Sequence, residues 1–402
     1  MFELDKFIEK YVTKRSHSMF EKDIEMNKEL LYEKIKDKSV LVIGGAGSIG
    51  SSFIKAILPF KPRSMVIVDT NENALAELTR DIRSTSGLYV PDDYIPYPMD
   101  FSSSVFEKMF KNRGGFDIVG NFSAHKHVRS EKDIFSIEAL LQNNVLNAKV
   151  LLDLLVQYPP EEYFCVSTDK AANPVNIMGA SKRIMEDIIF SYSDRFPVKT
   201  ARFANVAFSN GSLPAGFLSR ISKLQPISAP LDIKRYFVSP EESGQICMLA
   251  CMLGENREIF FPRLEEEQMM TFDEIATNLI HEYGYEILLC ASEQEAVSKG
   301  EELKNGRRRY PVYYSKTSTS GEKTYEEFYT KDEQVDLYRL RSLGIVINKK
   351  IPDQLKIQNL LDKLENTFRY EKATKKEIIT IISTYLPNFK HIETGKSLDS
   401  KM

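Results

Sequence analysis

The 402-residue sequence has few cysteines, a net charge near zero and no long apolar run. Its four cysteines form no CxxC pair, so we expect reduced core residues and no metal site. The formal net charge of −3 argues against a basic nucleic-acid surface. No apolar run approaches the ~18 residues of a membrane-spanning helix, and the acidic first residues contain no signal-peptide core. We therefore expect a cytoplasmic protein that binds neither nucleic acid nor membrane.

Short β-branched segments alternate with helix-length segments from residue 39 onward. This alternation predicts an α/β fold, with a Rossmann-like doubly wound parallel sheet that helices cover on both faces. After about residue 205, glycine and proline interrupt the pattern and indicate a second, smaller lobe. The predicted division is a helical N-terminal extension at 1–38, a dinucleotide-binding domain at 39–206 to which a helix at 240–258 returns, a mostly C-terminal substrate-binding lobe at 207–239 and 259–345, and C-terminal helices with a mobile tail at 346–402.

A glycine-rich turn follows the first predicted strand and opens a predicted helix. It reads Gly44-Gly-Ala-Gly47-Ser48-Ile49-Gly50. Gly44 allows the tight turn, Gly47 lets the backbone approach a diphosphate, and Gly50 lets the helix pack close to the strand. The free N–H groups at the helix start, near Ser48 and Ile49, favour the negative charge of that diphosphate. The turn therefore predicts a dinucleotide site.

Carboxylates at the ends of the next two predicted strands indicate which dinucleotide binds. Asp69 ends the second strand; its carboxylate would accept hydrogen bonds from the adenosine ribose and repel a 2′-phosphate. This favours NAD over NADP. Asp100 ends the third strand and is a candidate for the adenine amino group, the alternative being a loop carboxylate. The remaining candidate cofactor contacts are Phe101, Ser123 and Ala124.

Polar residues follow the fifth predicted strand, where the sequence reads Ser167-Thr168-Asp169-Lys170. Ligands bind at the carboxyl ends of strands in an open parallel sheet, so we expect Thr168, Asp169 and Lys170 to face the crevice. Asp169 and Lys170 are a candidate acid–base pair, because burial favours the neutral form of each. The alternative is a capping aspartate beside a solvated lysine.

The helix after this turn carries Met178 and Lys182, four residues apart and therefore on one face. The Lys182 ammonium is a candidate to hold the nicotinamide ribose and to lower the pKa of a nearby hydroxyl. The alternative is a lysine on the helix surface. Met178 ends in a thioether, which neither donates nor accepts a proton usefully.

In order and spacing, these segments resemble the nucleotide-sugar 4,6-dehydratases of bacterial polysaccharide biosynthesis, in the extended short-chain dehydrogenase/reductase superfamily. The resemblance runs through about residues 39–330 and rests on Gly44–Gly50, Asn121–Val128, Ser167–Lys170, Met178–Lys182, Arg202–Val206, Ser209–Ser212, Arg235–Val238 and Gly321–Glu327. Met178 stands where other members carry a catalytic tyrosine, which resembles the non-inverting UDP-N-acetylglucosamine 4,6-dehydratases. Many relatives carry N-terminal membrane helices, and this sequence resembles the soluble form.

The resemblance implies NAD-dependent conversion of UDP-N-acetylglucosamine, or a similar nucleotide sugar, to UDP-2-acetamido-2,6-dideoxy-α-D-xylo-hexos-4-ulose with the C5 configuration retained. Oxidation at C4 acidifies the C5 proton, which neutral Lys170 removes while protonated Asp169 protonates the leaving C6 hydroxyl. Hydride then returns to C6. Thr168 would hydrogen-bond the 4-hydroxyl, and the route of its proton, through a water or the nicotinamide ribose to Lys182 or bulk, stays open.

The same resemblance implies a homo-oligomer and a set of substrate contacts, His125, Lys126, Asn205, Arg235 and Glu322. Arg220 joins this set as a candidate diphosphate clamp, because guanidinium pairs well with phosphate. A structural salt bridge is the alternative for each arginine.

Three other functions compete with this assignment. An inverting 4,6-dehydratase is disfavoured by Met178, and a C4 epimerase is disfavoured by the Asp169–Lys170 pair, which epimerisation does not need. A non-catalytic NAD-binding scaffold would suit Met178 alone, but it gives no reason to keep Asp169, Lys170 and Lys182 together.

Overall fold

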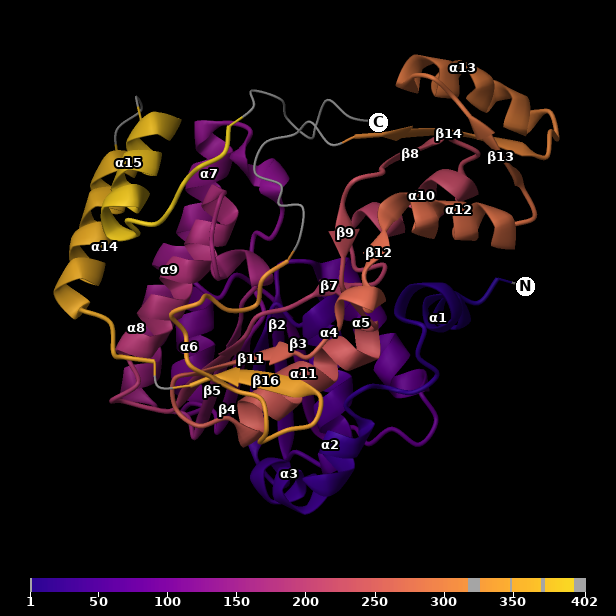
Figure 1. The fold of residues 1–402 in the computed structure, drawn as a ribbon. Helices are drawn as coiled ribbons and strands as arrows, with labels where there is room; N and C mark the ends of the chain where they lie inside the picture. Colours follow the sequence, from indigo (N-terminus) through magenta and orange to yellow (C-terminus); the bar gives the residue numbers. More distant parts are fainter. Residues whose placement is uncertain (1, 317–325, 348, 370–372, 394–402) are drawn as a thin grey trace.

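The computed structural model describes residues 2–316, 326–347, 349–369 and 373–393 (Figure 1). Their buried apolar side chains form two cores. The larger core surrounds a sheet of order β15-β16-β11-β6-β5-β4-β1-β2-β3. Its strands are β1 (Ser39–Ile43), β2 (Ser64–Asp69), β3 (Asp93–Pro98), β4 (Ile118–Asn121), β5 (Glu162–Val166), β6 (Val198–Ala201), β11 (Glu258–Pro262), β15 (Val335–Asp336) and β16 (Leu343–Val346). All neighbouring strands from β3 to β11 pair in parallel, and the central strands β4 and β5 are fully buried, as is typical of a parallel sheet with both faces covered.

Helices cover both faces of this sheet (Figure 1). On one face α3 (Lys28–Ile35) and α4 (Ser48–Ile57) pack against α11 (Pro240–Leu253). On the other, α9 (Ile177–Ser191) contacts α7 (Ile134–Leu141) and α8 (Asn147–Gln157). The sheet edge near β3 carries α5 (Glu72–Ser84), and α6 (Ser104–Asn112) precedes β4. The predicted doubly wound α/β fold is confirmed.

The prediction was wrong about the strands after residue 257. It placed 259–345 in the small lobe, whereas β11, β15 and β16 extend the large sheet beyond β6. The helix expected at 240–258 ends at Leu253, and the chain then enters β11. Every residue of β11 is buried, and β16 returns antiparallel to it. These strands join the large sheet because it buries their apolar residues, although the small lobe is closer to them in the sequence.

The small lobe has a parallel sheet of order β13-β14-β8, formed by β8 (Ile227–Pro230), β13 (Glu286–Leu289) and β14 (Arg309–Ser315). Its helices are α10 (Leu213–Ser222), α12 (Phe272–Glu282) and α13 (Glu293–Lys304). Two short pairs lie between the lobes: β7 (Asn205–Val206) with β10 (Phe237–Val238), and β9 (Lys234–Arg235) with β12 (Met270–Thr271). These pairs carry Asn205 and Arg235, two of the predicted substrate contacts.

Both ends of the chain are helical. The N-terminal segment forms α1 (Leu4–Phe7) and a π-helical turn at Ile8–Thr13, whose apolar residues belong to the small-lobe core, and α2 (Glu21–Met26) then precedes α3. At the other end α14 (Gln354–Phe368) and α15 (Lys375–Tyr385) pair and lie near α9 (Figure 1). The last residues of the predicted tail, 394–402, lie outside the described residues.

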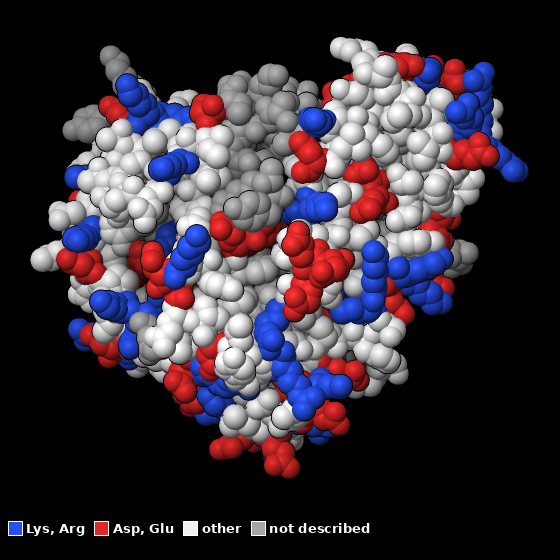
Figure 2. All heavy atoms as spheres, in the orientation of Figure 1, with Lys and Arg blue, Asp and Glu red and all other residues white. Residues whose placement is uncertain are grey.

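The surface mixes charges of both signs. On the face shown in Figure 2, lysine and arginine side chains alternate with aspartate and glutamate over both lobes. Within the described ranges, no helix is both long and apolar enough to span a bilayer.

Candidate active site

The glycine turn connects β1 to α4 at the carboxyl edge of the large sheet. Gly44 has a φ of +70°, and a Cβ there would lie 2.6 Å from the Ser123 backbone nitrogen. A Cβ on Gly50 would lie 2.4 Å from the Gly44 carbonyl oxygen. The N-cap of α4 is Gly47, which has no side chain to occupy the first N–H groups of the helix. The turn is therefore a backbone cradle that fits a diphosphate.

Asp69 braces this cradle from the end of β2. Its Oδ2 accepts a hydrogen bond from the Ala46 backbone nitrogen at 3.0 Å, and its Oδ1 accepts one from the Asn71 backbone nitrogen at 2.9 Å. Because an ionised carboxylate has about four lone-pair sites, Asp69 keeps acceptor capacity for two ribose hydroxyls.

Asp100 and its neighbours are engaged locally. The Asp100 Oδ1 accepts hydrogen bonds from the backbone nitrogen and the hydroxyl of Ser102, at 2.7 and 2.8 Å, which is the loop role given above as its alternative. Phe101 is buried. The hydroxyl of Ser123 donates to the Asn143 side-chain oxygen at 3.3 Å. An adenine contact from Asp100 stays a prediction.

Alanine at Gly50 is expected to destabilise the fold, whereas alanine at Gly47 is expected to weaken cofactor binding in a folded protein. The Gly50 Cβ would meet backbone atoms of Gly44 and Gly45 at 2.4 and 2.8 Å, so a loss of about 1–3 kcal/mol is expected. At Gly47 φ is −72° and the nearest atom is 3.3 Å away, but a methyl group would fill space that the diphosphate needs. Thermal unfolding and NAD titration separate the two effects. Unchanged NAD affinity in Gly47→Ala would contradict the assignment.

A cavity of about 780 Å³ lies between the carboxyl edge of the large sheet and the small lobe. This volume lies within the range of small-molecule sites. Its lining includes, from the predicted residues, Ile49, Ala124, Lys126, Thr168, Asp169, Lys170, Met178, Lys182, Asn205 and Arg220. The small lobe closes the far side with apolar residues, among them Leu213, Phe237 and Phe272. The structure therefore joins the predicted catalytic residues and half of the predicted substrate contacts in one cavity.

The acid–base candidates form a close pair at the end of β5. Lys170 Nζ lies 2.9 Å from Asp169 Oδ1 and 3.1 Å from its Oδ2. The Thr168 hydroxyl also donates to Asp169 Oδ1, at 2.8 Å. Asp169 is buried, and the Lys170 side chain is 24% exposed. The alternative of a solvated lysine beside a capping carboxylate does not describe this geometry.

Helix α9 presents the next two residues to the cavity. The Asn176 side chain caps the helix by accepting from the Gly179 nitrogen at 2.6 Å. The Met178 backbone nitrogen donates to Glu131 Oε1 at 3.0 Å, while its side chain lines the cavity. Lys182 is 4% exposed, which excludes the helix-surface alternative. Burial lowers the pKa of Lys182, and Cys165 and Glu186 oppose that shift.

The six predicted substrate contacts differ in where they lie. Lys126, Asn205 and Arg220 line the cavity, whereas His125 is exposed and does not line it. Arg235 lies behind the wall instead, because β9 pairs with β12 and its guanidinium sits 3.8 Å from Glu326 Oε1. Its Nη1 also donates to the Lys234 carbonyl oxygen. Glu322 lies outside the described residues.

The sequence did not single out Asn144. It lies in a π-helical turn, Gln142–Leu146, between α7 and α8. Its side-chain oxygen accepts from the His125 nitrogen at 2.9 Å, and its Nδ2 donates to the His125 carbonyl oxygen and to Ser181. Asn144 thus fixes the loop that carries His125 and Lys126. The π-helical turn is the structural signal, since such turns often mark functional sites.

Glu326 is the second residue that the sequence did not single out as a contact. It is 7% exposed, and its carboxyl group accepts from the Asn205 side chain at 2.7 Å and from the Tyr236 backbone nitrogen at 2.9 Å. Burial and the nearby Asp169 raise the pKa of Glu326 to about 8, against the opposing effects of Lys170 and Arg235.

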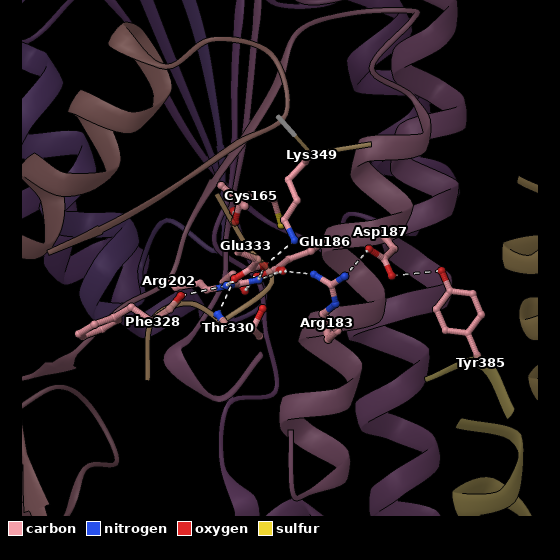
Figure 3. Close-up of polar contacts among 12 residues, drawn as sticks. Cys165, Arg183, Glu186, Asp187, Arg202, Phe328, Thr330, Glu333, Lys349 and Tyr385 are labelled. Atoms are coloured by element: carbon pink, nitrogen blue, oxygen red, sulfur yellow. Dashed lines mark hydrogen bonds and ion pairs between the residues drawn. The ribbon is translucent and has the colours of Figure 1, made fainter. Parts of the chain in front are cut away.

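A buried charge network supports the catalytic elements from behind (Figure 3). Arg202 is fully buried and contacts Glu186 on α9 at 2.8 and 2.9 Å and Glu333 at 2.7 and 3.0 Å. It also donates to the Phe328 carbonyl oxygen at 2.9 Å. Glu186 accepts a further hydrogen bond from Ser167, next to the acid–base pair. One guanidinium therefore joins α9, the end of β5 and the segment that follows Glu326.

The curated relatives include proteins of polysaccharide biosynthesis. An uncharacterized membrane protein of Methanocaldococcus jannaschii is 28% identical over 77% of this chain and 86% of its own length. The capsular polysaccharide biosynthesis protein CapD of Staphylococcus aureus is 25% identical over 82% of this chain, which spans about half (53%) of that relative. A UDP-N-acetylglucosamine 4,6-dehydratase (inverting) of Campylobacter jejuni is 25% identical over 61% of this chain and 72% of its own length.

Solved structures share the fold. Pen from Bacillus thuringiensis matches with a TM-score of 0.63 and 20% identity, over 82% of this chain and 98% of that chain. DesIV, a dTDP-glucose 4,6-dehydratase from Streptomyces venezuelae with NAD bound, matches with a TM-score of 0.51 and 19% identity, over 69% of this chain and 88% of that chain. Residues 40–348 match the family described as polysaccharide biosynthesis protein, and the chain belongs to this family.

Proposed function

We propose that this chain is an NAD-dependent nucleotide-sugar dehydratase of the non-inverting type, acting on UDP-N-acetylglucosamine in the cytoplasm as a homo-oligomer. The observation that carries the proposal is the Asp169–Lys170 pair, in which Asp169 is buried and which lines the cavity beside Met178 and Lys182. Such a pair is required for elimination across C5 and C6, and a C4 epimerase or a scaffold does not need it.

The bound cofactor would supply the hydride acceptor at C4 and the hydride donor at C6. The residues that would hold it are those of the glycine cradle, with Asp69 for the adenosine ribose and Lys182 for the nicotinamide ribose. The cradle excludes a Cβ at Gly44 and Gly50, which fits close approach of a diphosphate.

Hydrogen bonds around Asp169 offer a path for the 4-hydroxyl proton. Ionised Asp169 accepts that proton through the Thr168 hydroxyl, which already donates to it. Its protonation removes the counter-charge of Lys170, which releases a proton to bulk water and regains one from bulk water after the turnover. Neutral Lys170 then takes the C5 proton, and Asp169 returns its proton to the leaving C6 hydroxyl as water forms. Return of the C5 proton from the same lysine keeps the C5 configuration.

Met178 supports the non-inverting type over the inverting type named for the Campylobacter relative. Its side chain is buried at the cavity wall, and a thioether cannot exchange protons with the sugar. Lys170 is then the base on one face of the sugar only, so the C5 proton leaves and returns on the same face, as retention of the C5 configuration requires.

Incubation of the purified chain with UDP-N-acetylglucosamine and NAD in D₂O tests the proposal. Proton NMR is expected to show loss of the C6 hydroxymethyl signals and growth of a C6 methyl signal. For product formed in H₂O, reduction of the ketone and measurement of the H4–H5 coupling then report the C5 configuration. A galacto product would instead show an epimerase, an inverted C5 would show the inverting type, and absence of turnover would favour the scaffold.

A further inference from the structure

A carboxyl group stands directly behind the substrate side of the cavity wall. Glu326 Oε1 accepts from the Asn205 side chain, and Glu326 Oε2 accepts from the backbone nitrogen of Tyr236, between β9 and β10. Arg235 Nε lies 3.8 Å from Oε1. Asn205 lines the cavity, whereas Arg235 and Glu326 do not. Glu326 thus connects a wall residue to a buried cation that is not itself in the wall.

The charges around Glu326 come from three parts of the chain. Asp169 and Lys170 act on its charge from the end of β5, and Arg235 does so from β9, where its Nε lies 3.8 Å from Glu326 Oε1. The titratable hydroxyl of Tyr236 also senses its charge. Asp169 and Lys170 nearly cancel as an ion pair, so the proton of Glu326 decides the local charge. Protonation of Glu326 removes one negative charge from behind the cavity wall, and loss of the proton restores that charge.

We propose that Glu326 is a positioning residue that holds Asn205 and Arg235 and that takes up a proton when the diphosphate of a nucleotide sugar enters the cavity. This inference rests on the proposed function, because it needs an anionic ligand beside Lys126 and Arg220. A diphosphate favours positive charge in the wall, and the buried carboxyl is the group that can change it by one unit. By linkage, the anion and the proton each strengthen binding of the other.

The sign of the pH effect follows from the position of the carboxyl. Burial and Asp169 raise the pKa of Glu326 to about 8, so the group is neutral below that pH and ionised above it. Ionisation adds negative charge next to the bound diphosphate. Affinity for the diphosphate should therefore be constant at neutral pH and fall as the pH rises through about 8, by at most tenfold per pH unit for one proton.

Isothermal titration of the NAD-loaded full chain with UDP tests this inference without turnover. The titrations run from about pH 7.5 to about pH 9.5, where the terminal phosphate of UDP is already ionised. We expect the Kd of the unchanged protein to rise about tenfold over this range. Repetition in two buffers of different ionisation enthalpy should show proton uptake on binding. Glu326→Gln should weaken UDP binding at neutral pH, because an amide cannot accept both hydrogen bonds, and should remove the pH dependence.

Glu327→Gln is the matched control, since Glu327 is the next residue and its contact with Asn173 is exposed. It should keep the pH dependence of the unchanged protein. A Kd that does not change with pH, or a slope that survives in Glu326→Gln, overturns the inference while leaving the proposed function intact. If Glu326→Gln does not fold, absence of proton uptake by the unchanged protein overturns it equally. Absence of UDP binding at every pH overturns the nucleotide-sugar assignment and this inference with it.

Discussion

The substitutions Asp169→Asn and Lys170→Met are each expected to lower dehydratase turnover by about 10²–10⁴-fold, the range for loss of a positioned acid or base. Asparagine can still accept the Thr168 hydrogen bond, but it cannot take the 4-hydroxyl proton or protonate the leaving hydroxyl. Methionine keeps the length of Lys170 and lacks the amine. NMR turnover with UDP-N-acetylglucosamine measures both losses.

The two variants should fail at different steps. Lys170→Met is expected to oxidise C4 and stop, so the absorbance of reduced cofactor should accumulate without C5 exchange in D₂O. Asp169→Asn loses the proton acceptor for the first step and should show little reduced cofactor. The matched control is the surface ion pair of Lys149 and Asp153 on α8, where the same substitutions should leave turnover unchanged. Full turnover in either active-site variant would refute the proposed chemistry.

Local patterns in the sequence predicted which residues lie at the carboxyl edge of the large sheet, where the candidate site is. The glycine turn, Asp69 and the Asp169–Lys170 pair each follow directly from a strand ending, and parallel strands bring their carboxyl ends together. The structure places these groups on that edge, at the ends of β1, β2 and β5. Local sequence patterns were therefore sufficient to predict the residues that lie at the ends of strands.

Contacts between distant segments could not be predicted in the same way. Glu326 lies 121 residues after Asn205 in the sequence, and no periodic pattern predicts the hydrogen bond between their side chains. The π-helical turn that holds Asn144 interrupts an apolar pattern that reads as one helix. Arg235 could be recognised as a basic residue near the substrate side, but only the pairing of β9 with β12 shows that it lies behind the wall. These features depend on tertiary packing rather than on local spacing.

The substitution Arg202→Met is expected to destabilise the fold by about 3–5 kcal/mol, because it removes the guanidinium that pairs with buried carboxylates. Glu186 is fully buried, and Glu333 is 7% exposed. Although burial raises it, Arg202 and Lys349 lower the pKa of Glu333 to about 2. Denaturant unfolding measures the loss. Arg183→Met is the matched control, because Arg183 contacts the same Glu186 from a position that is 24% exposed, so a smaller loss is expected.

The pH dependence of unfolding distinguishes a lost charge partner from lost packing. The folded pKa of Glu333 is depressed, so its contribution to stability is present above the unfolded pKa near 4.3 and is lost as the pH falls towards 2. In Arg202→Met that acid-sensitive contribution should disappear, and Glu186→Gln in the same background should recover part of the stability. Because Arg202 also holds the segment that follows Glu326, the folded fraction of Arg202→Met should bind UDP more weakly than the unchanged protein. Equal UDP affinity, or an unchanged acid dependence, would show that the network only fills space.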